Sequence, residues 1–397
     1  MRATLLVSLA VTLPLAAQTP PSPPVPLPPP APAPAPAPAV KRTLELTGLV
    51  LVNGFFTNAR VNNSDVPQFA DSLAPASAVG GTIRQTRLGL LVTEPDVLRG
   101  SFSGEVDLDF FGGQQPSSGG RTFPLVRLRR AVGIVSWAHA QLLFGQESPL
   151  VAERSPRSLA SVGFPDFAAA GNLWLWLPQF RVTLEQGYSL RLAEQVAVLA
   201  PTSGTAQGLF NTQPDSAERS RRPYLQARVR LAWGPTDDPN EIAIGGHLGW
   251  LASADTLFQS RAVTADARFQ VGSVELLAEA FSGKALAGLG GGGIGQSLGP
   301  TGQEVRTTGG WGQLNVRPRR EVVVGAGCGI DDPDDGDLSD ALGNPQGRLK
   351  NLVCAGHVEV RPRGPLVFGV EFRRFETTYP SGKFTANHFN LAAGYRF

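Results

Sequence analysis

The stretch that decides the fold is the last fifteen residues, Lys383 to Phe397, which read K-F-T-A-N-H-F-N-L-A-A-G-Y-R-F. Apolar side chains occupy one parity of this stretch, and polar or small side chains occupy the other. The first set holds Phe389, Leu391, Ala393, Tyr395 and Phe397, and the second holds Ala386, His388, Asn390, Ala392, Gly394 and Arg396. Strict alternation predicts a β-strand with one apolar face. Two interpretations follow: a surface strand of a soluble sandwich, or a strand whose apolar face meets lipid.

Alternating segments of this kind recur along the chain after residue 41. We predict sixteen strands, at residues 42–56, 82–93, 98–111, 124–136, 140–147, 173–185, 189–200, 222–233, 241–250, 260–270, 273–282, 304–316, 320–330, 350–360, 365–375 and 384–397. Short connections alternate with mostly long ones, and 251–259 and 376–383 belong to the long set. This layout is typical of outer-membrane barrels, whereas a soluble propeller or sandwich has no reason to keep the alternation.

The strand patterns also predict where charged residues face. In 98–111, 222–233 and 365–375, most charged residues share one parity and most large apolar residues share the other. In a wide barrel the charged face lines a water-filled lumen and the apolar face meets lipid. Because apolar and polar residues alternate along each strand, a barrel can lie in a membrane although its mean hydropathy is only -0.04. We therefore predict an all-β, up-and-down, transmembrane antiparallel β-barrel in outer-membrane lipid. The net charge of +2 argues against nucleic-acid binding.

The N-terminal 41 residues have a different composition from the rest. Residues 1–17 combine Arg2, an apolar core and small residues before Gln18, which predicts a secretory signal peptide. Residues 18–41 are rich in Pro and Ala and predict a disordered periplasmic tether, because proline lacks a donor and fixes φ. A spacer that reaches the cell wall and an unselected leader are both open interpretations. The barrel is assigned to 42–397, with both termini in the periplasm.

Aromatic residues mark the predicted membrane boundaries. An interfacial girdle is indicated by Trp137, Trp233, Trp250, Trp311 and Tyr395, which lie near predicted strand ends. Trp174 and Trp176 follow a long connection, and girdle residues of strand 173–185 are one interpretation of them. The chain finishes on aromatic-x-Phe, with Tyr395 and Phe397. This ending resembles the C-terminal assembly signal of bacterial outer-membrane β-barrels. The resemblance implies recognition of the last strand by the barrel-assembly machinery.

A second resemblance covers residues 125–185. There L-V-R-L-R-R-A-V-G-I-V-S-W runs into Q-L-L-F-G-Q-E-S-P-L, followed by G-F-P-D-F-A-A-A-G-N-L-W and L-P-Q-F-R-V-T-L-E. This order resembles bacterial porins, in particular the phosphate-selective porin O and P type and related trimeric channels. The resemblance implies a sixteen-stranded homotrimeric barrel whose third loop folds inward and sets the pore size. It does not imply phosphate specificity, because the sequence shows no dense lysine cluster.

On this resemblance, residues 148–172 form the constriction loop. Arginines are expected to face carboxylates across the lumen, and such facing charges create a field that selects solutes by charge. The alternative is that the same charges pair with one another as ordinary lumen residues. The local excess of arginine predicts a mild anion preference. The predicted constriction and lumen residues are Glu105, Asp107, Asp109, Arg127, Arg129, Glu153, Arg154, Arg157, Asp166, Arg181, Arg228 and Arg230.

The chain contains two cysteines, Cys328 and Cys354. Both lie on the predicted outward parity of neighbouring strands that are joined by loop 331–349. They should therefore face each other across the hairpin. Because the predicted compartment is oxidising, we expect a disulfide that braces the loop.

The remaining motifs indicate no catalytic or metal site. The acidic stretch 331–340 resembles a calcium loop in composition but lacks EF-hand ligand spacing, so a solvated acidic loop is favoured. None of the four histidines has metal-ligand spacing, and no nucleophile motif accompanies His247 or His388. We predict no enzyme and no cofactor. Three hypotheses compete: a passive porin for small hydrophilic solutes or ions, a non-conducting barrel used for attachment or structure, and, least favoured, a barrel enzyme that uses a lumen histidine with a serine.

Overall fold

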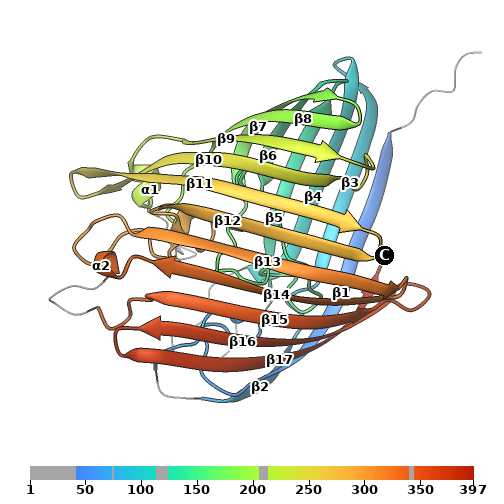
Figure 1. Ribbon diagram of the computed structural model, residues 1–397. Coiled ribbons are helices and arrows are strands. Elements are labelled where there is room, and N and C mark those ends of the chain that lie inside the picture. The colour runs from blue at the N-terminus through green and yellow to red at the C-terminus, as the bar shows by residue number, and fades with distance from the viewer. Residues whose placement is uncertain (1–41, 74–75, 113–123, 205–212, 339–343) are drawn as a thin grey trace, which may run out of the picture. The chain divides into compact units, whose positions relative to one another are not determined.

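The computed structural model describes residues 42–73, 76–112, 124–204, 213–338 and 344–397. The predicted signal peptide (1–17) and tether (18–41) lie outside the described residues. The described part is almost entirely β-structure (Figure 1). Its strands are β1 (Thr43–Thr57), β2 (Ala78–Thr82), β3 (Arg87–Val97), β4 (Gly100–Gly112), β5 (Leu125–Ser136), β6 (Ala140–Glu147), β7 (Leu177–Gly187), β8 (Leu190–Leu199), β9 (Tyr224–Trp233), β10 (Asn240–Ser253), β11 (Thr256–Val271), β12 (Val274–Lys284), β13 (Arg306–Arg319), β14 (Val322–Pro333), β15 (Lys350–Val360), β16 (Leu366–Tyr379) and β17 (Gly382–Arg396).

The sheet closes on itself. From β3 onward each strand pairs antiparallel with the next one in the chain, and β17 pairs with β1 from Leu49↔Arg396 to Thr57↔His388. β2 and β3 both pair with β1, one with each half of it, so they form a single wall strand interrupted at 83–86. The wall therefore has sixteen strands, and the predicted antiparallel up-and-down barrel is confirmed.

The two faces of the wall differ as the alternation predicted. On β17, Phe389 and Leu391 point outward and are exposed, while His388 and Asn390 point inward and are buried. The same division holds on β16, where Phe372 is outward and Arg373 inward. The inward residues are buried because chain segments fill much of the lumen, as described below.

The two ends of the barrel differ in their connections. Figure 1 shows α1 (Ser216–Arg219) and α2 (Asp335–Leu338) at one end and the C-terminus at the other. Long loops join most strands at the first end. Two of the predicted long connections, 251–259 and 376–383, are not loops. Residues 251–259 and 376–383 are mostly strand, because β10–β11 and β16–β17 turn tightly at 254–255 and 380–381. None of the described helices is both long and apolar enough to cross a membrane.

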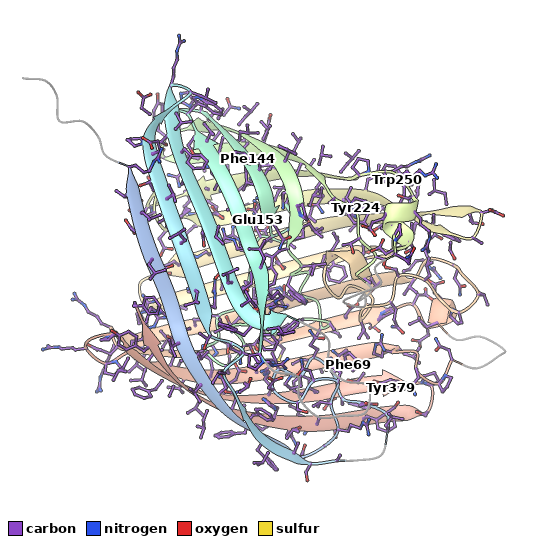
Figure 2. All side chains as sticks on the ribbon, turned by 180° about the vertical axis from the view of Figure 1, so that it is seen from behind. Phe69, Phe144, Glu153, Tyr224, Trp250 and Tyr379 are labelled. Atoms are coloured by element: carbon purple, nitrogen blue, oxygen red, sulfur yellow. A yellow bond between two sulfur atoms is a disulfide. The ribbon has the colours of Figure 1, made fainter. Side chains whose placement is uncertain are left out.

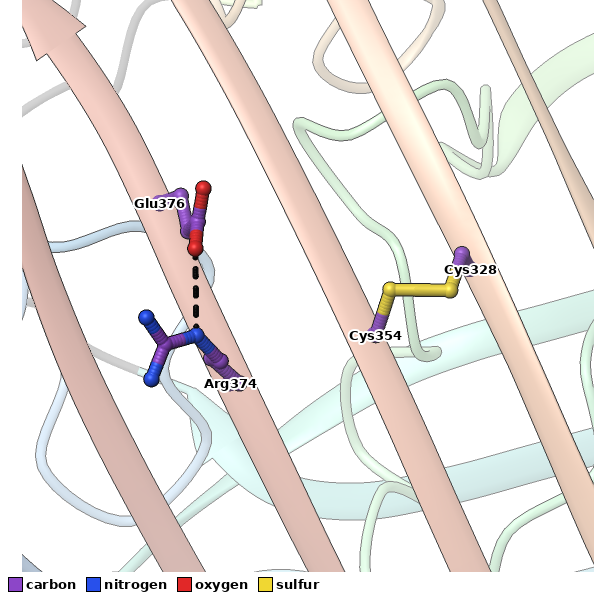
Figure 3. Close-up of a disulfide and its surroundings, with 4 residues drawn as sticks. All are labelled: Cys328, Cys354, Arg374 and Glu376. Atoms are coloured by element: carbon purple, nitrogen blue, oxygen red, sulfur yellow. Dashed lines mark hydrogen bonds and ion pairs between the residues drawn. A yellow bond between two sulfur atoms is a disulfide. The ribbon is translucent and has the colours of Figure 1, made fainter.

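Cys328 and Cys354 form a disulfide on the outward face of β14 and β15. They are directly opposite each other in the register of the two strands. Figure 3 shows the disulfide beside Arg374 and Glu376 of β16, whose side chains pair at 3.1 Å. The disulfide encloses a sequence separation of 26 residues, including the acidic loop.

Replacing both cysteines by serine should destabilise the barrel. A cross-link that closes a loop of this length restricts the unfolded chain, and its loss should lower the free energy of unfolding by about 2–4 kcal/mol. Denaturant titration of the folded protein measures this change, and wild-type protein treated with reductant should match the variant. Conductance should be unaffected, because the sulfurs face away from the lumen. Equal unfolding midpoints for variant and wild type would contradict the expectation.

Candidate functional site: the arginine-rich lumen

The segment 148–176, here called the inward loop, lies inside the barrel between β6 and β7. It is longer than the predicted 148–172, because β7 begins only at Leu177. Its apolar residues pack against loop 285–305, which also enters the lumen: Leu150 and Leu173 share a buried cluster with Leu286 and Leu289. Glu153 of the inward loop, labelled in Figure 2, pairs with Arg228 at 2.7 Å. The inward loop and loop 285–305 therefore pack against each other inside the barrel.

Side chains of the wall hold the backbone of the inward loop. Gln313 of β13 accepts from Arg157 N at 2.7 Å and donates to Arg157 O at 2.9 Å. Asn351 of β15 donates to Ala169 O at 2.8 Å. Gly171 has φ +92° and lies so close to the backbone of β13 that a Cβ would be 2.3 Å from an oxygen there. These contacts fix the course of the loop along the wall.

Ion pairs join the inward loop to distant strands. Glu153 accepts from Arg228 of β9 at 2.7 Å and also from Arg181 of β7. Asp266 of β11 accepts from Arg228 at 2.8 Å and from Arg154 at 2.9 Å. The side chain of Arg228 is completely buried between these two carboxylates. The network ties three strands to the loop.

Arg157 and Asp166 anchor the loop at two further points. The Arg157 guanidinium donates to Glu275 of β12 at 2.5 and 2.6 Å, and these hydrogen bonds raise the pKa of Arg157 above its ordinary value. Asp166 is fully buried, 3.4 Å from Arg373 of β16, which also pairs with Glu371 at 2.8 Å. Arg157 is half exposed to the lumen, whereas Asp166 is a buried anchor.

A β-bulge in β5 changes which arginines face the lumen. Asp107 of β4 is opposite Arg130, and the next residue, Leu108, is opposite Leu128, so Arg129 is the extra residue. Both Arg129 and Arg130 then reach carboxylates on the inner side of the wall. Of these two neighbours, strict alternation places only Arg129 on the lumen face, so Arg130 was absent from the predicted lumen residues.

The carboxylates of β4 lie beside the arginines and not across the lumen from them. Asp109 accepts from Arg127 at 2.9 Å, and Asp107 is 3.2 Å from Arg129. Glu105 is 2.8 Å from Arg130. The expected opposition of an acidic and a basic side is therefore wrong for these strands, because neighbouring strands carry both partners of each pair.

Aromatic residues expected in the girdle belong instead to the lumen. Trp174 and Trp176 precede β7 and line the internal cavity. The Arg129 guanidinium lies 4.5 Å from the Trp176 ring. Trp311 is buried and donates from Nε1 to Glu279 at 2.9 Å. Their positions in the sequence resembled strand ends, but loop folding and inward parity place them inside.

A cavity of about 720 Å³ lies between the inward loop and the wall. Arginines dominate its charged lining. Its ten arginines and four glutamates are Arg87, Arg129, Arg130, Arg154, Arg157, Arg181, Arg230, Arg317, Arg361 and Arg396 with Glu147, Glu153, Glu241 and Glu359. The lining is therefore strongly positive.

Half of the predicted lumen residues line this cavity. They are Arg129, Glu153, Arg154, Arg157, Arg181 and Arg230. The others act as partners behind its surface: Glu105, Asp107, Asp109, Arg127, Asp166 and Arg228. Sequence reasoning missed Arg317 and Arg396, although their inward parity on β13 and β17 could have identified them.

A histidine and a serine do meet, but not as a catalytic pair. His247 Nε2 lies 3.0 Å from Ser260 Oγ, and Ser260 donates to Ala285 O at 2.8 Å. Because the hydroxyl hydrogen is used there, Nε2 must donate to Oγ and cannot act as its base. Gln226, not a carboxylate, contacts Nδ1 at 3.1 Å. The pair is buried, so its geometry fits a structural role.

Comparison with known proteins supports the fold. No protein-family model matches the chain, and no curated protein matches it. The outer-membrane channel DcaP of Acinetobacter baumannii is similar in structure, with a TM-score of 0.67 and 19% identity over 90% of this chain and 98% of DcaP. An anion-selective porin from Comamonas acidovorans has a TM-score of 0.58 and 12% identity, and the match covers 90% of this chain and 100% of the porin. Salmonella typhi OmpF, in complex with daunomycin, has a TM-score of 0.55 and 10% identity, and the match covers 89% of this chain and 97% of OmpF. The chain therefore has the fold of bacterial outer-membrane porins.

Replacing Arg228 by glutamine should destabilise the protein. The change leaves Asp266 buried and Glu153 partly buried, each with one of its two arginine partners removed. This should lower the free energy of unfolding by about 3–5 kcal/mol. Tryptophan fluorescence during denaturant titration measures the loss.

The matched control is Arg317→Gln. Arg317 is exposed in the lumen and makes no ion pair among the residues that the structure describes. Its replacement should change the unfolding free energy by less than about 0.5 kcal/mol. Equal effects of the two changes would show that the buried network contributes nothing to stability.

Proposed function

We propose that this chain is an outer-membrane channel through which small hydrophilic solutes diffuse passively, with a preference for anions. The observation that carries the proposal is the charge of the lumen: ten arginines and four glutamates line one cavity inside a closed barrel. A positive, partly dehydrated passage raises the local concentration of anions and lowers that of cations. The Comamonas porin, described as anion-selective, has the same fold, which is consistent with the proposal.

The arginines nearest the short turns contribute most of the uncompensated charge. Arg317 and Arg396 line the cavity, and neither makes an ion pair within the described part of the chain. Glu359 is the nearby carboxylate, and it pairs with Arg361. By contrast, Arg154 and Arg157 are each bound to wall carboxylates. Selectivity should therefore depend on the first two residues more than on the paired ones.

The competing hypothesis is a non-conducting barrel for attachment or structure. The buried cluster formed by the inward loop and loop 285–305 is the feature that favours it, because apolar packing inside a lumen obstructs passage. Conductance of the refolded protein in planar bilayers separates the two hypotheses. Steady openings support the channel, and their absence from well-folded barrels supports the structural barrel. Steps in groups of three would support the predicted homotrimer.

The reversal potential in a salt gradient should indicate anion selectivity. The anion-to-cation permeability ratio should fall as salt rises, because the Debye length shortens from about 10 Å at 0.1 M to about 3 Å at 1 M. Replacing Arg317 and Arg396 together by glutamine should lower the ratio by about twofold or more at low salt.

The control for this measurement is Arg374→Gln, which removes an arginine from the outward face. It should leave the permeability ratio unchanged. A cation-leaning potential in the wild type would keep the channel and reject the role assigned to the arginines.

A further inference from the structure

A string of four aromatic rings runs from the barrel wall into the lumen. Phe111 of β4 meets Phe164 of the inward loop edge to face, with ring centroids 5.1 Å apart. Phe164 meets Trp174 at 4.9 Å, and Trp174 meets Trp176 at 5.5 Å, again edge to face. Phe111 is buried, whereas both tryptophans are only partly buried and line the cavity. The string therefore ends in two indoles at the surface of the cavity.

Arginines cover the rings on either side of Trp174. Arg127 lies 4.8 Å from the Phe164 ring, and Arg129 lies 4.5 Å from the Trp176 ring. Within the described part of the chain, no guanidinium lies over the ring of Trp174. Apolar surface that is left facing water is unfavourable. Trp174 therefore presents a ring to the cavity that no cation covers.

Hydrogen-bond donors without a partner lie near this ring. The indole N–H groups of Trp174 and Trp176 make no hydrogen bond among the residues that the structure describes. Arg129 donates from Nη1 to Val162 O and to Asp109, but its Nη2 makes no hydrogen bond to any described residue. Carboxylate oxygens accept from both kinds of donor. The wall thus combines a ring face with donors for a carboxylate.

The backbone that carries the two tryptophans is held in place. Leu175, which lies between them, donates from its N–H to Leu289 O at 3.2 Å. Gly290 has φ +101° and lies so close that a Cβ there would be 2.4 Å from Leu175 N. Loop 285–305 therefore packs directly against this segment. A surface that is fixed in advance binds a solute with a smaller loss of conformational entropy.

The charges around the two indoles balance one another. Three arginines share Asp107 and Asp109, which leaves one positive charge, and two glutamates share Arg130, which leaves one negative charge. The arginines of the first group are Arg87, Arg127 and Arg129, and the glutamates of the second are Glu105 and Glu147. A patch that is neutral as a whole cannot select solutes by net charge. It can select them by the shape and aromatic character of a ring.

We propose that Trp174 is a stacking platform for small planar aromatic carboxylates, whose carboxylate group accepts hydrogen bonds from Trp176 Nε1 and Arg129 Nη2. This inference rests on the proposed function for the passage of the solute but not for its binding. Arg317 and Arg396, which line the same cavity, attract anions in general. The platform then distinguishes aromatic anions from aliphatic ones.

The test measures binding to the folded full chain in detergent by isothermal titration calorimetry. Benzoate and cyclohexanecarboxylate carry the same charge and are similar in size, but only benzoate is planar and aromatic. The wild type should bind benzoate about fivefold more tightly, as expected for one additional aromatic pair. Trp174→Leu keeps an apolar side chain without an aromatic face and should abolish this preference. The matched control is Trp250→Leu, because Trp250 points outward from β10 and its loss should leave the preference intact.

Several outcomes would overturn the proposal. Equal affinities of the wild type for the two acids would reject it, and this comparison does not depend on the folding of any variant. An unchanged preference in Trp174→Leu would place the ring elsewhere. Benzyl alcohol that binds as tightly as benzoate would remove the carboxylate from the site, and displacement of benzoate by maltose would assign the platform to sugars.

Single-channel conductance, measured in parallel, keeps this inference separate from the channel hypothesis. Conducting barrels that bind both acids equally would reject the platform and keep the channel. Well-folded barrels that prefer benzoate but do not conduct would reject the channel and keep the platform.

Discussion

The pairing of β1 with β17 is the constraint on which the rest of the structure depends. In lipid an unpaired strand edge leaves backbone donors and acceptors without partners, at a cost of several kcal/mol each. Closing the sheet removes both edges, and it divides every strand into a lipid face and a lumen face. The apolar residues must then point outward, so the polar residues that a soluble protein would expose are gathered inside. A charged interior is thus a consequence of closure.

Inside the barrel, acidic and basic residues have different roles. The carboxylates Glu153, Asp266 and Glu275 are used to hold the inward loop, and each has an arginine partner. Each of these ion pairs neutralises one carboxylate and one arginine. Arginines outside these pairs, such as Arg317 and Arg396, line the cavity without a carboxylate partner among the described residues. The positive sign of the cavity lining comes from its excess of arginines over glutamates, although the net charge of the whole chain is only +2.

Alternation along the sequence was sufficient to predict the barrel, its strand number and the facing of most side chains, because lipid imposes a period of two on every strand. It failed where the backbone departs from that period. The bulge at Arg129 adds a residue that brings Arg130 inside, and no local pattern announces it. Contacts over long sequence separations, such as Arg154 with Asp266, were also out of reach, because they depend on the path of a loop without periodicity. Trp174 and Trp176 were misplaced for the same reason.

The disulfide also affects how the barrel can be assembled. A one-residue slip between β14 and β15 would turn apolar side chains into the lumen, so lipid rejects it, but a two-residue slip preserves the alternation. Both strands contain several small residues, including Gly325, Gly327 and Gly356, whose side-chain packing discriminates poorly between such alignments. Because Cys328 and Cys354 are opposite each other only in the native alignment, their bond selects it covalently. An oxidised hairpin would therefore enter the membrane already committed to one alignment, whereas a reduced hairpin would still have to find it.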